Sequence, residues 1–256
     1  MATSAPRIWA LIPCAGSGSR AGGALPKQYQ RVGGLPAVLH SLHAFAAVPE
    51  VAGSLLVLSP SDTNFDENIG QKLGLFTTLL VAYCGGITRH ESVFNGLSYL
   101  FDKNIDPNDW ILVHDAARCL ITSAQIRALI DAVQDDAVGG LLALQVPDTL
   151  KSSVDGRVAT TIDRADKWLA QTPQMFRAGL LHRALREATQ GVTDESSAIE
   201  QLGLRPKLVE GSAQNFKVTY PEDFALADRV LRGRMDLTAS HFQPTPDASN
   251  SAYDYP

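Results

Sequence analysis

Short apolar runs alternate along the chain with longer segments whose apolar residues fall on one side. The uninterrupted runs predict buried strands over residues 8–12, 54–58, 79–83, 110–113 and 140–145. Between them, apolar positions recur every three or four residues, as an amphipathic helix requires, over 36–47, 92–101 and 122–133. Strands that alternate with helices are typical of a parallel sheet covered on both faces. The pattern predicts an α/β fold: a Rossmann-like, mostly parallel sheet flanked by helices.

This alternation breaks over a segment of about residues 146–173. Two short extended runs flank Asp155-Gly156, a dipeptide that favours the tight turn of a β-hairpin. We interpret the segment as a protruding β-hairpin arm, of the kind that serves as a lid or joins subunits. We expect the remaining elements of the domain to be helices at 178–188, 196–202 and 221–231 and a strand at 208–210.

The chain therefore reads as one domain over residues 7–232, followed by a tail. Residues 235–256 are polar and contain several prolines, so we expect them to be disordered. The N-terminus lacks the charged and then apolar layout of a signal peptide, because the first strand follows at once. No apolar run reaches the ~18 residues that a membrane helix needs.

Composition limits the partners and the compartment. The net charge of −5 argues against general nucleic-acid binding, so affinity for phosphate has to come from local cations. The three cysteines, Cys14, Cys84 and Cys119, are an odd number without metal-ligand spacing. Free thiols of this kind are typical of cytoplasmic proteins.

The loop after the first strand carries the strongest chemical signal. It reads Gly16-Ser17-Gly18-Ser19-Arg20, and Lys27 follows seven positions after Arg20. Glycines let backbone N–H groups approach a phosphate closely, and oriented amides form a concave anion site. Two permanent cations beside such a loop indicate binding of a nucleoside triphosphate.

Other glycine-rich nucleotide loops fit less well. The segment 16–21 matches the loose dinucleotide fingerprint, but Gly22-Gly23 and Pro26 prevent the helix that should follow. The second strand ends in Ser59-Pro60, without the acidic residue that would bind a ribose. No Gly-Lys-Ser/Thr follows the loop, so the Walker pattern fails too. An NAD-dependent dehydrogenase is therefore disfavoured, and a glycine turn that binds nothing remains the plain alternative.

Two further loops are expected at the same edge of the sheet, where ligands of such folds bind. Gly85-Gly86 follows the third predicted strand, and residues 114–118 follow the fourth. Within the second loop, Asp115 suits either a binding site or a turn cap. We interpret His114 as a packed histidine and Asp194 as a helix cap.

Several local patterns occur together and in order. They are Gly16-x-Gly18-x-Arg20, Pro26-Lys27-Gln28-Tyr29, Gly85-Gly86 with Arg89 and Ser92, His114-Asp115-Ala116-Ala117-Arg118, Asp148-Thr149-Leu150-Lys151, Asp163-Arg164 with Trp168, Thr172-Pro173-Gln174, Thr193-Asp194-Glu195 and Asn215-x-Lys217-Val218-Thr219. Each is weak alone. Over roughly residues 7–232, the set closely resembles the 2-C-methyl-D-erythritol 4-phosphate cytidylyltransferases of the non-mevalonate isoprenoid pathway.

The resemblance implies a reaction and a set of site residues. CTP and methylerythritol phosphate would give a cytidyl diphosphate alcohol and pyrophosphate. The implied catalytic residues are Arg20 and Lys27 on the CTP phosphates and Arg164 and Lys217 on methylerythritol phosphate. The implied nucleotide pocket comprises Ala15, Gly16, Gly18, Gly85, Gly86, Ser92 and Ala116, and the implied contacts to the second substrate are Asp115, Arg118 and Thr149.

The resemblance also implies a cofactor and an assembly. Mg²⁺ would be bound mainly by phosphate oxygens and water, with Asp115 as the one candidate acidic ligand. Two subunits would interlock through the arm, so that Thr149 and Arg164 serve the partner's site. Only a short segment follows Leu231, so we expect none of the second catalytic domain that some members carry.

The chain departs from the family pattern in two loops. Cys119 follows Arg118 directly where many relatives have proline, which affects the expected role of Arg118. Ile87 occupies a position that is often polar, so a side-chain contact to the nucleotide is lost there. Two related functions stay open: transfer to another polyol phosphate such as ribitol 5-phosphate, and nucleotide binding by a non-catalytic regulator.

Overall fold

The computed structural model describes most of the chain between residues 5 and 240. The described residues are 5–16, 25–65, 69, 76, 78–189 and 191–240, with side chains described as far as 234. Two residues expected in the site, Gly18 and Arg20, lie outside these ranges, as does the last part of the expected tail, residues 241–256.

A seven-stranded sheet forms the centre of the described structure, in the order β11-β7-β10-β6-β1-β4-β5. Its strands are β1 (Ile8–Pro13), β4 (Val51–Val57), β5 (Leu79–Ala82), β6 (Trp110–Val113), β7 (Gly139–Gln145), β10 (Trp168–Arg177) and β11 (Lys207–Glu210). β10 is antiparallel to both of its neighbours, β6 and β7, whereas the other pairs in the sheet are parallel. The predicted α/β fold with a mostly parallel sheet is confirmed.

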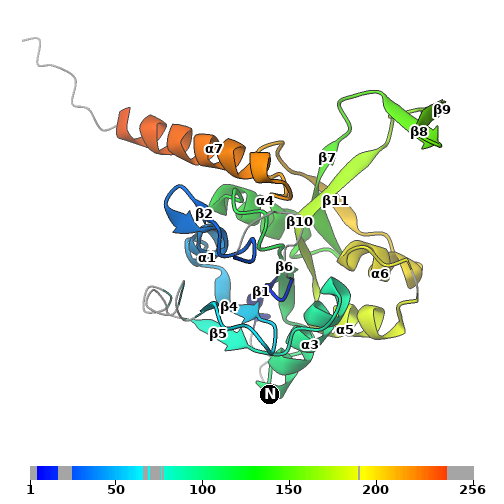
Figure 1. Ribbon diagram of the computed structural model, residues 1–256. Helices are drawn as coiled ribbons and strands as arrows, with labels where there is room; N and C mark the ends of the chain where they lie inside the picture. The colour runs from blue at the N-terminus through cyan, green and yellow to red at the C-terminus, as the bar shows by residue number, and fades with distance from the viewer. Residues whose placement is uncertain are drawn as a thin grey trace, which may run out of the picture.

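Helices cover both faces of this sheet (Figure 1). On one side lie α1 (Ala37–Ala46), α4 (Ser123–Val133) and α7 (Pro221–Ser240), and on the other lie α3 (Arg89–Asp102), α5 (Ala178–Glu187) and α6 (Glu195–Gln201). A small hairpin of β2 (Arg31–Val32) and β3 (Leu35–Pro36) contacts α7. None of the described helices is both long and apolar enough to cross a membrane.

The apolar runs are continuous because both faces of each central strand are buried. In β1, Ala10 and Ile12 belong to the core beneath α1 and α4, whereas Leu11 belongs to the core beneath α3 and α5. Successive side chains of a strand point to opposite faces, so one run of apolar residues fills two cores. The sheet is thereby fixed between two helical layers, and the carboxyl ends of β1 and β6 are held side by side.

The described helices α3, α4 and α6 each begin at a residue whose side chain caps the helix. Thr122 caps α4 in a reciprocal capping box with Gln125, at the start of the helix predicted over 122–133. α3 begins at Arg89, earlier than the predicted residue 92, because Thr88 and Glu91 form a second capping box. Asp194 caps α6, which confirms its predicted role.

The structure corrects two of the expected elements. The strand β10 runs through Thr172-Pro173-Gln174, a segment for which the sequence predicted no strand, so the arm ends before the predicted residue 173. The pairing of β10 with β7 shifts register between Ala170 and Gln174. This irregularity accommodates Pro173, which has no N–H to donate to the neighbouring strand. α7 continues to Ser240, so residues 235–240 are helical rather than part of a disordered tail; no proline or glycine interrupts them.

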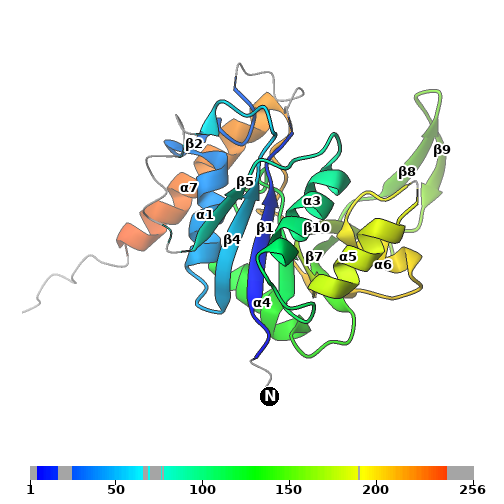
Figure 2. The same ribbon diagram turned by 90° about the horizontal axis from the view of Figure 1, so that it is seen from below.

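The predicted hairpin arm is confirmed. It consists of β8 (Leu150–Val154) and β9 (Arg157–Ile162). Asp155 and Gly156 connect the strands, both with positive φ, as a type I′ turn requires. Figures 1 and 2 show the arm extending away from the body, and its residues are largely exposed.

Candidate nucleotide-binding site

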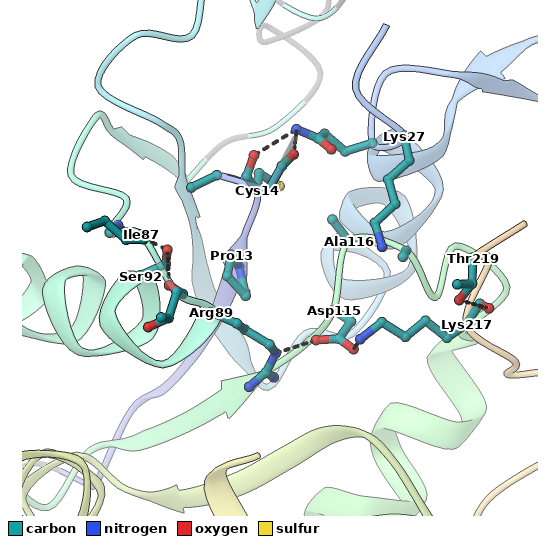
Figure 3. A pocket seen from close by; sticks show the side chains of 16 residues that line it. Pro13, Cys14, Lys27, Ile87, Arg89, Ser92, Asp115, Ala116, Lys217 and Thr219 are labelled. Carbon is teal, nitrogen blue, oxygen red and sulfur yellow. Dashed lines mark hydrogen bonds and ion pairs between the residues drawn. The ribbon is translucent and has the colours of Figure 1, made fainter. Parts of the chain in front are cut away.

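A cavity of about 320 Å³ opens at the carboxyl ends of β1 and β6 (Figure 3). The segments that enclose it are the loop after β1, the start of α3, the loop after β6 and the segment before α7. Their lining residues are Pro13, Cys14, Ala15, Gly16, Lys27, Gln28, Gly86, Ile87, Thr88, Arg89, Ser92, Asp115, Ala116, Ala117, Lys217 and Thr219. The predicted meeting of three loops at one sheet edge is therefore confirmed.

The loop after β1 is held in place from both sides. The Cys14 N–H donates to the carbonyl of Val57 at 2.7 Å, which extends the sheet by one residue. The buried Gln28 amide donates to the carbonyls of Cys14 at 2.8 Å and Gly16 at 3.3 Å. Because the carbonyls of Cys14 and Gly16, on either side of Ala15, are engaged, Ala15 and Gly16 form a fixed part of the cavity wall.

Gly85 and Gly86 bring a second loop against the first. A Cβ at Gly85 would collide with the side chain of Ala15 and would lie 2.8 Å from the Leu58 carbonyl oxygen. The Gly86 N–H donates to the hydroxyl of Ser92 at 3.1 Å, which ties the loop to the first turn of α3. The structure thus brings Ala15, Gly86 and Ser92 together, with Gly85 packed directly behind them.

Asp115 lies between two cations on the opposite wall. Its Oδ1 accepts from Arg89 Nε at 2.7 Å, and its Oδ2 pairs with Lys217 Nζ at 2.7 Å. Burial raises the pKa of the Asp115 carboxyl, but the charges and hydrogen bonds of Arg89 and Lys217 outweigh burial and hold the pKa well below its usual range. Asp115 is therefore an anion that fixes two cations, as Figure 3 shows.

Arg89 is itself held by a second carboxylate. Its two terminal nitrogens pair with the oxygens of Glu195 at 2.7 and 2.9 Å, and Glu195 is only 1% exposed. Burial lowers the pKa of Arg89, but the charges of Glu195 and Asp115 outweigh it, so the net shift is upward. Arg89 and Glu195 both occur within the quoted patterns, but their sequence context predicts no role for either of them.

His114 is structural, as predicted. Nε2 donates to the carbonyl of Arg118 at 3.2 Å, which leaves Nδ1 to accept from the Thr172 hydroxyl at 3.1 Å. The Thr172 oxygen in turn accepts from the N–H of Asp115 at 3.0 Å. Burial lowers the pKa of His114 to about 4, so the ring is neutral and positions the loop that carries Asp115.

Lysines contribute most of the charge that faces the cavity. Lys27 lines it, and Figure 3 shows its side chain extending toward the loop that holds Ala116. Lys217 lines it from the segment before α7, where the Val218 N–H donates to the carbonyl of Ala117 at 2.9 Å. The described lining residues include three cations, Lys27, Arg89 and Lys217, but only one carboxylate, that of Asp115. Because positive charge is in excess, the cavity suits an anion.

Comparison with known proteins identifies the family. The family model described as 2-C-methyl-D-erythritol 4-phosphate cytidylyltransferase matches residues 8–233. The chain belongs to this family. A cytidylyltransferase of that name from Cupriavidus pinatubonensis is 50% identical over 236 residues, which is 88% of this chain and 94% of the relative.

Further relatives agree with this cytidylyltransferase assignment. The bifunctional enzyme IspD/IspF of Albidiferax ferrireducens is 58% identical over 248 residues, or 97% of this chain, but the chain spans only 57% of that relative. A solved 4-diphosphocytidyl-2C-methyl-D-erythritol synthase superposes with a TM-score of 0.78 at 40% identity and covers 88% of this chain and 99% of its own. The solved cytidylyltransferase of Francisella tularensis superposes with a TM-score of 0.72 at 29% identity. The match covers 87% of this chain and 99% of that one.

Besides Gly85, which packs behind the wall, three described residues implied by the family resemblance do not line this cavity. The guanidinium of Arg118 donates to the carbonyls of Asn215 at 2.7 Å and Ala170 at 3.2 Å, so it joins the Lys217 segment to β10. Arg164 and Thr149 lie at the exposed base of the arm, where Arg164 donates to the carbonyl of Pro147. Within the described chain, the cavity thus brings together the glycine-lined wall, Lys27, Asp115 and Lys217, but not the arm residues.

Proposed function

We propose that the protein transfers CMP from CTP to 2-C-methyl-D-erythritol 4-phosphate and releases pyrophosphate. The observation that carries the proposal is the cavity where a glycine-lined wall faces Lys27 and Lys217. Cytidine would lie against Ala15, Gly86 and Ser92, where backbone groups and a hydroxyl offer hydrogen bonds to a base edge. The lysines would take the phosphates of the two substrates.

The proposed chemistry needs cations rather than a general base. A phosphate oxygen of methylerythritol phosphate, which is close to a dianion at neutral pH, attacks the α-phosphorus of CTP. A new P–O bond forms there, and the bond to the bridging oxygen breaks, so pyrophosphate leaves with the electron pair. Lys27 would stabilise the charge that develops on the phosphates, and Lys217 would hold the attacking phosphate. Arg20 would assist Lys27, although it lies outside the described residues.

Mg²⁺ is proposed to enter with the triphosphate. No group of three potential acidic, histidine or cysteine ligands occurs among the described residues, and both oxygens of Asp115 already pair with cations. This donor set fits an ion that keeps phosphate and water ligands, with Asp115 at most at its edge. The ion would supply further positive charge at the triphosphate.

A homodimer is proposed from the position of the arm. Val154 and Val158 are 63% and 66% exposed, and Ile162 is 40% exposed, so the arm presents apolar side chains to solvent. Arg164 and Thr149 lie on this arm outside the cavity, and a partner's cavity is where they would meet substrate. The three free cysteines fit a cytoplasmic enzyme.

Pyrophosphate release by the purified protein with CTP and Mg²⁺ tests the proposal. We expect release with methylerythritol 4-phosphate, and we expect Lys27→Ala to lower kcat by about 10²–10³-fold. Lys103→Ala, an exposed lysine just after α3, should keep wild-type activity. Release only with ribitol 5-phosphate would move the enzyme to another pathway, and CTP binding without any release would indicate a regulator.

A further inference from the structure

Arg89 is held in a single orientation by two carboxylates from different elements. Its terminal nitrogens form a fork on Glu195, the first residue of α6, at 2.7 and 2.9 Å. This leaves Nε as the atom that faces Asp115, at 2.7 Å. A planar guanidinium bound on two edges has no freedom to turn, which an ammonium group in its place would have.

The contacts continue from Arg89 to Lys217. Asp115 uses Oδ1 for Arg89 and Oδ2 for Lys217, so the carboxylate links the two cations. At the two ends of this path the Glu195 side chain is 1% exposed and that of Lys217 is 39% exposed, while Arg89 and Asp115 between them are 27% and 9% exposed. The chain of charges therefore begins in the protein interior and ends at an ammonium group that lines the cavity.

The buried end of this chain is anchored to the sheet. The amide of Gln174, in β10, donates to the Asp194 cap at 2.8 Å and accepts from the Ser196 N–H at 2.8 Å. Glu195 lies between these two contacts. Its position is therefore fixed by β10 as well as by α6.

We propose that Arg89 and Glu195 are positioning residues for the transfer reaction. Glu195 orients the Arg89 fork, Arg89 fixes the Asp115 carboxylate, and Asp115 holds the Lys217 ammonium at the point where the attacking phosphate binds. The inference rests on the proposed function, because it assumes that Lys217 binds that phosphate. In this proposal Arg89, although it lines the cavity, acts through Asp115 and Lys217 rather than on the substrate.

The substitution Glu195→Gln distinguishes an effect of charge from an effect of positioning, because the two predict opposite results. This nearly isosteric change removes a negative charge near an anion site, so simple electrostatics would tighten the binding of both substrates. If Glu195 instead positions Arg89, the substitution should loosen the contact of the Arg89 guanidinium with residue 195 and let Lys217 move. We expect kcat to fall on the order of tenfold to a hundredfold, with little change in the KM for CTP.

Two further variants separate positioning from folding. Arg89→Lys keeps the charge but cannot hold both carboxylates at once, so it should lower kcat as Glu195→Gln does. Glu187→Gln removes an exposed carboxylate from α5 and should leave kcat unchanged. Thermal unfolding of each variant shows whether the fold is intact. Equal kcat for wild type, Glu195→Gln and Arg89→Lys would overturn the inference.

A double-mutant cycle with Lys217→Met gives the decisive measurement. If Glu195 acts through Lys217, then Glu195→Gln should have almost no further effect on kcat/KM once Lys217 is replaced. Independent, multiplying losses would overturn the inference and make Glu195 a structural residue only. Wild-type turnover in the same assay tests the proposed function separately, since its absence would refute that function and not the ion-pair geometry.

Discussion

At the scale of single residues, we expect His114 to make the stability of the fold depend on pH. Its neutral ring donates to Arg118 and accepts from Thr172, and burial lowers its pKa to about 4. The unfolded chain therefore binds a proton below pH ~6.5 that the folded chain does not bind until about pH 4. The free energy of unfolding should therefore fall by about 3 kcal/mol as the pH falls through that window, because each unit of pKa difference is worth ~1.4 kcal/mol.

The free energy of unfolding in urea between pH 4.5 and 7.5 measures this loss. We expect His114→Gln to be less stable than wild type at pH 7.5 but to show a flatter dependence on pH. Identical slopes for His114→Gln and wild type would show that another group carries the dependence.

The sequence reveals which residues are charged but not which charges meet. Lys27 and Lys217 were predictable because they occur in recognisable patterns beside loops at the edge of the sheet. Glu195 follows a helix cap and looks like an ordinary first-turn acid, a position that the helix dipole already favours. Its contact with Arg89 spans 106 residues, and nothing local in the sequence indicates a pairing at that separation.

At the scale of elements, Gly85 controls how closely the Gly85-Gly86 loop approaches the loop after β1. Gly85→Ala would push a methyl group into Ala15 and the Leu58 carbonyl, both of which are backed by the sheet. We expect the wall to open and the KM for CTP to rise about tenfold or more, because the contacts to the base would be misplaced. Steady-state kinetics with varied CTP measures this rise.

A glycine in open space provides the matched control. Gly233, in the exposed part of α7, has no atom within 4 Å of where a Cβ would lie. Gly233→Ala should keep the KM for CTP and stabilise the protein by about 0.5–1 kcal/mol, since alanine favours a helix. A KM unchanged in Gly85→Ala would mean that the wall tolerates the extra methyl group.

The elements that the sequence predicted well are those with a clear hydrophobic period. β1 and α4 follow their patterns closely, and the Asp155-Gly156 turn specifies the hairpin. The sequence did not predict β10, because Pro173 and the polar Gln171 and Gln174 are not typical of a central strand. Those glutamines are buried and bind the Ser212 carbonyl and the start of α6, so their polarity serves contacts beyond the strand.

At the scale of the whole molecule, the arm separates two sets of site residues that the reaction would use together. Lys27 and Lys217 line the cavity of the body, whereas Thr149 and Arg164 lie at the exposed base of the projecting hairpin. Figure 2 shows the hairpin clear of the body. If a partner's cavity receives the arm, each active site combines one protomer's body with the other's arm, as a two-fold symmetric dimer allows.

Mixing two inactive variants tests this arrangement directly. Lys27→Ala disables a body and Arg164→Ala disables an arm, so each homodimer should be nearly inactive. In the mixed dimer, one site combines both defects, but the other pairs an intact body with an intact arm. Random reassociation of equal amounts, after mild dissociation, should therefore restore about a quarter of wild-type turnover. Arms that served their own bodies would leave the mixture as inactive as its components, because every site would then keep one defect.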